Sequence, residues 1–189
     1  MASPSNIRMD WRTKPAEPTA RPIPSPAERP TDLIPAERYV SREWAQREWD
    51  NVWMHSWHLV CRDQDIPDVG DYIEFELGDQ SVLLVRTDDD TVTGYYNSCL
   101  HRGMQLRKGC GSMTEIRCGY HSWCWNLDGS IAEVLDPYEY HPSLITDDAL
   151  RLPEIRVETW GGWYFVNFDD DAVPLLEHLS PLAEELSAY

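Results

Sequence analysis

The chain has 189 residues, 42% of them hydrophobic, and a formal net charge of −17. This length favours one globular domain, and the acidic balance argues against nucleic acid or an anionic membrane as the main partner, because the field of the protein would repel phosphate. No stretch reaches the roughly 18 apolar residues of a membrane span, and no apolar export segment follows the first charges, so we expect a cytoplasmic location.

The first predicted element is a proline-rich arm. Residues 1–38 contain eight of the 14 prolines and few apolar side chains. Such a segment cannot offset the entropy cost of ordering, so we expect it to be disordered or extended. After it, Ser41 can cap a helix of about three turns, whose apolar face runs from Ala45 to Trp53.

Short strands follow the predicted helix. Segments rich in β-branched and aromatic residues, separated by turn residues, lie at 57–60, 71–77, 81–86, 91–96, 156–160 and 163–168. Gly161 and Gly162 between the last two fit a two-residue hairpin turn. The pattern predicts a mostly β fold, an antiparallel β-sandwich over residues 39–172. Ser180 and Pro181 predict the start of a short helix in a tail over residues 173–189.

The cysteines and histidines carry the chemical signal. Five cysteines are an odd number in a chain without an export signal, which favours metal ligation over disulfides. The stretch CLHRGMQLRKGCGSMTEIRCGYHSW has the form Cys-x-His, sixteen residues, Cys-x-x-His. Each half pairs one thiolate with one imidazole, as a binuclear iron cluster with two Cys on one iron and two His on the other requires. This spacing predicts a Rieske-type [2Fe–2S] cluster held by Cys99, His101, Cys118 and His121.

Tetrahedral zinc is the alternative, because it also accepts two Cys and two His. Zinc modules usually place the two cysteines together and the two histidines together, and here the order is interleaved. Four unrelated core residues at these offsets are a weaker alternative still.

Several segments resemble the N-terminal part of the α subunit of Rieske non-haem iron ring-hydroxylating oxygenases. The resemblance covers about residues 35–189 and rests on WHLVCRDQDIPDVGDY, NSCLHRGMQL, CGYHSWCWNLDGSI and WGGWYFVNFD besides the four ligands. It implies a β domain that passes electrons from a ferredoxin or reductase to a mononuclear Fe(II) site that activates dioxygen, with His121 as the electron exit. The catalytic domain that holds that iron has no counterpart in this sequence. The resemblance therefore implies that this chain has a catalytic domain or subunit elsewhere as its partner.

Three positions indicate the subtype within Rieske proteins. Met104 and Tyr120 stand where the cytochrome-complex type has a disulfide over the cluster, and Trp123 replaces a hydroxyl residue after the last histidine. The resemblance therefore implies a low-potential cluster of the oxygenase or ferredoxin type.

A group of basic residues surrounds the ligands in an otherwise acidic chain. Arg102, Arg107, Lys108 and Arg117 face a single acid, Glu115, between residues 101 and 118. They form either a solvated loop or a docking face for an acidic electron donor. Two functions remain open: the electron-transfer part of an oxygenase α subunit, which by itself would catalyse nothing, and a free-standing Rieske ferredoxin.

Overall fold

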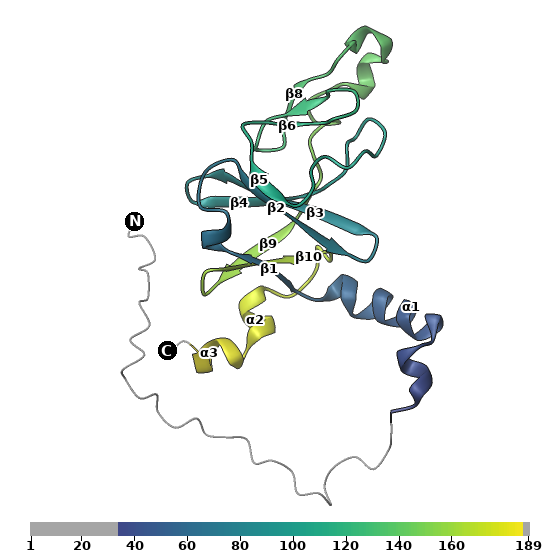
Figure 1. The fold of residues 1–189 in the computed structure, drawn as a ribbon, viewed down its shortest axis with the longest axis vertical. Coiled ribbons are helices and arrows are strands. Elements are labelled where there is room, and N and C mark those ends of the chain that lie inside the picture. The colour runs from purple at the N-terminus through teal and green to yellow at the C-terminus, as the bar shows by residue number, and fades with distance from the viewer. Residues whose placement is uncertain (1–33, 187–189) are drawn as a thin grey trace, which may run out of the picture.

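The computed structural model describes residues 34–186, and antiparallel strands dominate it (Figure 1). Seven strands form one sheet in the order β1-β10-β9-β4-β3-β2-β5, and three form a second sheet in the order β6-β7-β8. The strands are β1 (His58–Arg62), β2 (Asp71–Leu77), β3 (Gln80–Asp88), β4 (Thr91–Tyr96), β5 (Cys110–Ser112), β6 (Ile116–Arg117), β7 (Cys124–Trp125), β8 (Ile131–Glu133), β9 (Glu154–Trp160) and β10 (Trp163–Asn167). The predicted mostly β fold is confirmed, while the short strands β5 to β8 were not predicted.

Strand β3 separates two cores. Its side chains alternate between faces, and residues 82–85 are all fully buried. Val82 and Leu84 pack in a core with residues of β1, β9 and β10, whereas Leu83 and Val85 pack in a second core that extends to the small sheet. This second core also contains the predicted ligands Cys99 and Cys118. The rigid centre of the large sheet therefore supports the predicted site.

Strand β9 connects the two parts of the large sheet, the pair β1 and β10 on one side and the strands β4, β3, β2 and β5 on the other. Its first residues, Glu154 and Ile155, pair with β4, and residues 156–160 pair with β10. Gly161 and Gly162 connect β9 to β10 with φ values of +62° and +80°, the left-handed conformation that a tight two-residue hairpin turn requires. The predicted hairpin is confirmed.

The three α-helices of the described residues lie at the end of the molecule opposite the small sheet (Figure 1). Helix α1 (Arg42–Asn51) begins at Ser41, whose hydroxyl accepts a hydrogen bond from Trp44 N at 3.4 Å. It ends before the predicted Trp53, because the chain tightens into a 3₁₀ turn in which the Val52 carbonyl accepts from His55 N at 3.1 Å and from the Ser56 hydroxyl at 2.7 Å. The other helical elements are the 3₁₀ helices η2 (Ala36–Tyr39), η3 (Trp53–His55), η4 (Asp63–Asp65), η5 (Pro137–Glu139) and η6 (Pro142–Leu144), and the α-helices α2 (Leu175–Leu179) and α3 (Leu182–Leu186).

The predicted arm lies mostly outside the described residues. Of residues 1–38, the structure describes only 34–38, and η2 already begins at Ala36. In the tail, α3 lies where the sequence predicted a helix after Pro181, and α2 is an additional short helix.

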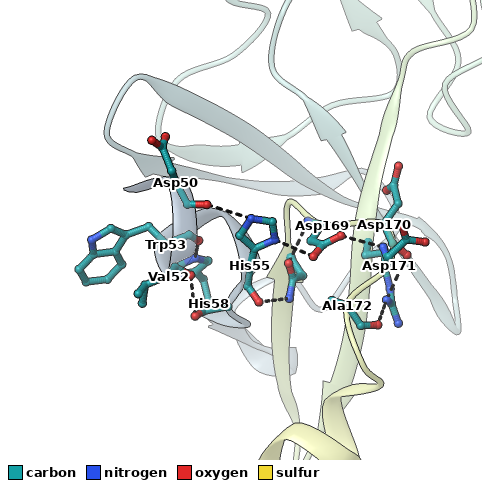
Figure 2. A network of polar contacts seen from close by, with 12 residues as sticks. Asp50, Val52, Trp53, His55, His58, Asp169, Asp170, Asp171 and Ala172 are labelled. Atoms are coloured by element: carbon teal, nitrogen blue, oxygen red, sulfur yellow. Dashed lines mark hydrogen bonds and ion pairs between the residues drawn. The ribbon is translucent and has the colours of Figure 1, made fainter. Parts of the chain in front are cut away.

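A polar network joins the segments that flank β1 and β10, the neighbouring strands at one edge of the large sheet (Figure 2). His55 Nδ1 lies 2.7 Å from Asp169 Oδ2, and His55 Nε2 lies 3.0 Å from the carbonyl oxygen of Asp50. The hydrogen bond to Asp169 raises the pKa of His55. Asp169 lies two residues after the end of β10, so this contact links the segment before β1 to the segment after β10. Over residues 34–186, no helix is long and apolar enough to cross a membrane.

Candidate metal centre

Two loops of the same construction carry the predicted ligands. In each loop the cysteine N–H donates to the carbonyl five residues later, and the cysteine carbonyl accepts from the N–H four residues later. The distances are 2.8 and 2.8 Å in the loop that begins at Cys99, and 2.8 and 3.2 Å in the loop that begins at Cys118. The donor four residues on, Gly103 or Ser122, has a positive φ in both loops. Each cysteine thus opens a closed turn that presents one histidine.

The two loops bring their ligands together in like pairs. Cys99 and Cys118 are 3% and 2% exposed and belong to one core cluster. Burial raises the pKa of the Cys99 thiol, and the neighbouring Cys118 thiol raises it further. The rings of His101 and His121 have centroids 4.6 Å apart. The structure therefore places two thiols beside each other and two imidazoles beside each other, although each loop contributes one of each.

His101 has the properties of a metal ligand. Its Nδ1 atom is buried and has no hydrogen-bond partner among the described residues, while Nε2 lies 3.2 Å from the Tyr140 hydroxyl. Burial lowers the pKa of His101, and the nearby His121 and Arg102 lower it further, which favours the neutral imidazole that binds metals. An unpartnered buried nitrogen beside a second histidine fits a metal-binding role.

The arrangement fits a binuclear cluster better than zinc. Within residues 34–186, no group of three or more His, Cys, Asp or Glu side chains is placed to hold a single metal ion. A tetrahedral zinc site needs four ligands around one ion, whereas each iron of a Rieske cluster takes only two protein ligands. Two thiols in one pair and two imidazoles in another match the two protein ligands that each iron of a Rieske cluster takes.

A buried polar network fixes the first ligand loop to the large sheet. Asn97, two residues before Cys99, is 3% exposed. Its Oδ1 accepts from the backbone N–H groups of Leu106 (3.1 Å) and Arg107 (3.0 Å), and its Nδ2 donates to Ser81 Oγ at 2.9 Å and to the Arg107 carbonyl at 2.7 Å. Glu74 of β2 accepts from the Gln105 side chain and from Gly109 N. Residues 97–109 are therefore attached to β2 and β3 at several points.

The four predicted docking residues occupy different environments. The Arg107 guanidinium donates to the carbonyl oxygens of Arg117 (2.6 Å) and Glu115 (3.2 Å), which connects the first ligand loop to β6. Arg117 donates to Glu115, to Glu133 and to the carbonyl of Ser122. Arg102 and Lys108 are exposed. Two of the four basic side chains thus hold the ligand loops together, and two extend into solvent.

Sequence reasoning used Trp123 only to indicate the subtype of the cluster, and it missed the contacts that Trp123 and Tyr140 make with the His101 ring. The ring of Trp123 stacks on the His101 ring, with centroids 4.8 Å apart and planes 14° apart, and Tyr140 meets the His101 ring edge-on at 5.7 Å. The position of Trp123 two residues after His121 could have indicated its proximity to the site. No local signal marks Tyr140, which lies 39 residues after His101.

Comparison with known proteins agrees with this geometry. The Rieske [2Fe-2S] domain family matches residues 56–144, which include all four predicted ligands. The chain is 32% identical to the carnitine monooxygenase oxygenase subunit of Escherichia coli (strain K12) over 154 residues, which are 81% of this chain and 41% of that protein. It is 29% identical to the benzene 1,2-dioxygenase subunit alpha of Pseudomonas putida over 179 residues, which are 94% of this chain and 38% of that protein.

Solved structures of oxygenases are also similar to this chain. The apo form of the quaternary ammonium Rieske monooxygenase CntA superposes with a TM-score of 0.76 at 27% identity, over 82% of this chain and 45% of that chain. Naphthalene 1,2-dioxygenase, as an F352V mutant bound to phenanthrene, superposes with a TM-score of 0.69 at 29% identity, over 75% of this chain and 32% of that chain. The chain thus spans less than half the length of these relatives. They are oxygenases, so they give no support to a free-standing ferredoxin.

Proposed function

Since this chain contains a Rieske [2Fe-2S] domain and is homologous to oxygenase α subunits, we propose that it receives single electrons and passes them to a mononuclear iron site of an oxygenase. That iron site would be held by residues outside the printed sequence. The relatives named above include a monooxygenase and dioxygenases with chemically unlike substrates, and the part that they share with this chain contains the Rieske domain. Electron transfer, rather than substrate binding, is therefore the role that we assign to this chain.

Four side chains would hold the cluster. Cys99 and Cys118 would bind one iron through their thiolates, and His101 and His121 would bind the other. The single observation that carries this assignment is the separation of the four donors into a buried thiol pair and an imidazole pair, with His101 Nδ1 unpartnered. When bound, the cluster supplies a one-electron carrier whose reduction localises on the iron bound by histidine.

The protein residues set the environment of this carrier. The core around Cys99 and Cys118 excludes water from the sulfur side, because both cysteines are almost fully buried. His101 and His121 are half-buried, and the ring of Tyr120, which is 61% exposed, packs on the His121 ring with centroids 3.8 Å apart. We therefore propose His121 as the point at which electrons leave toward the acceptor.

Anaerobic reconstitution with iron and sulfide tests the ligand assignment. We expect two irons and two sulfides per chain, a Rieske visible spectrum and a rhombic electron paramagnetic resonance (EPR) signal after reduction. Cys118→Ser should lose all three. Cys110→Ser is the matched control, because Cys110 is an exposed thiol of the same region, and this variant should keep the cluster. Stoichiometric zinc without an EPR signal, or a full cluster in Cys118→Ser, would contradict the proposal.

We further propose that Arg102 and Lys108 contribute to docking of an acidic ferredoxin or reductase. They are the exposed members of the basic group, whereas Arg107 and Arg117 are engaged with carbonyl and carboxylate oxygens. Lys108→Glu should slow reduction by such a donor at low salt and leave the cluster spectrum intact, because complementary charges accelerate encounter. Arg42→Glu on α1 makes the same change of charge at the opposite end of the molecule and should have little effect. Equal, salt-independent rates would contradict this docking surface.

A further inference from the structure

Tyr140 contacts a proposed cluster ligand from a distant part of the chain. Its hydroxyl lies 3.2 Å from His101 Nε2, and its ring is perpendicular to the His101 ring. It also packs edge-on against Trp123, with ring centroids 5.4 Å apart. Trp123 in turn stacks on the His101 ring. Two side chains from separate segments therefore fix one imidazole: Trp123 lies on its face, and Tyr140 contacts its edge and its outer nitrogen.

The segment that carries Tyr140 forms the tip of the molecule between β8 and β9 (Figure 1). It contains η5 and η6, and Tyr140 N donates to the Pro137 carbonyl at 3.3 Å. Tyr140 and Ile145 pack against the core cluster that contains Cys99 and Cys118. The Tyr140 hydroxyl is thus positioned by a segment that has its own internal hydrogen bonds and packs against the core.

His101 and His121 differ in the hydrogen bonds that their ring nitrogens make. Among the described residues, no hydrogen bond reaches the ring nitrogens of His121, while Nε2 of His101 is engaged by Tyr140. If His101 binds iron through its buried Nδ1, the neutral ring carries its proton on Nε2 and can only donate it. The Tyr140 oxygen is then the acceptor.

We propose that Tyr140 is a positioning residue, which holds the His101 ring through Nε2 and leaves His121 as the histidine open to the electron acceptor. This inference rests on the proposed function. A hydrogen-bond acceptor on the outer nitrogen of a ligand histidine makes that ligand more basic and fixes its orientation. A more basic ligand stabilises the ferric state, so the Tyr140 hydroxyl lowers the midpoint potential of the cluster.

Tyr140→Phe tests this role, because it removes the hydroxyl and keeps the ring that packs on Trp123. We expect the variant to bind the same amount of iron as the wild type but to have a higher midpoint potential. With ¹⁵N-labelled histidine, pulsed EPR of the reduced protein should show a change in one of the two histidine couplings. Tyr138→Phe is the matched control: it removes a hydroxyl that bonds to Asp136 in the same segment, and it should change neither quantity.

The outcomes separate this inference from the proposed function. A wild-type potential and unchanged couplings in Tyr140→Phe would overturn the role of Tyr140 while leaving the cluster assignment intact. Failure of both the wild type and Tyr138→Phe to bind a Rieske cluster would overturn the proposed function itself. If only Tyr140→Phe fails to bind iron, ¹⁵N NMR of the two apo-proteins decides. An unchanged His101 Nε2 chemical shift would overturn the hydrogen bond, and a changed shift would support it.

Discussion

We expect the side chain of Asn97, beside the ligand loops, to contribute strongly to the free energy of unfolding. Asn97→Ala removes an acceptor from the backbone N–H groups of Leu106 and Arg107 and a donor from the Arg107 carbonyl. Each such group left unsatisfied costs about 1–3 kcal/mol when buried. Leu106 is buried but Arg107 is only half-buried, so we take the low end of that range for each of the three groups and expect a loss of about 3 kcal/mol.

Thermal unfolding measures this loss. In a domain of this size 1 kcal/mol shifts Tm by about 2–4 °C, so Asn97→Ala should melt roughly 6–12 °C below the wild type. Asn126→Ala is the control, because its exposed side chain bonds only to the Ser130 hydroxyl and its loss should change stability by less than about 0.5 kcal/mol. If both variants melt together with the wild type, the Asn97 network does not hold the ligand loop and the reasoning fails.

Two further substitutions test the large sheet. Gly94→Ala would place a Cβ 2.6 Å from the Ile155 side chain, and we expect urea denaturation to show a loss of about 1–3 kcal/mol; an unchanged midpoint would contradict this packing. His55→Gln removes the contact with Asp169. Because the pKa of His55 is raised in the folded state, its contribution is complete below its ordinary pKa of about 6.5 and disappears as pH rises through the folded-state pKa. The stability difference from wild type, measured by urea denaturation at several pH values, should therefore be largest below about pH 6.5 and should shrink as the pH rises above it; a difference that does not change with pH would contradict this contact.

Local patterns in the sequence were sufficient to predict the longer elements, and they also led to the proposed ligand set. Segments rich in β-branched and aromatic residues between turn residues predicted the strands at 71–77 and 91–96 with the bounds of β2 and β4, and the adjacent glycines predicted the hairpin between β9 and β10. The ligand set could be proposed from the sequence because each predicted half-site lies in one short loop, where spacing along the chain nearly determines spacing in three dimensions.

Long-range contacts were not predictable in the same way. The pairing of β1 with β10 joins residues about a hundred positions apart, and no local pattern encodes which strands become neighbours. The same holds for the contact of Tyr140 with His101. The basic group illustrates a different limit: charge alone does not distinguish Arg107, whose guanidinium is used inside the fold, from Lys108, which is exposed.

The pairing of β1 with β10 also has a mechanical consequence. His58 at the start of β1 lies opposite Val166 near the end of β10, so the chain enters and leaves this strand pair at the same side. A force applied through the two ends of the domain would load these hydrogen bonds one after another, as in a zipper, rather than all together in shear. The pair would therefore peel apart at low force, while the loops that begin at Cys99 and Cys118 lie outside the line of tension.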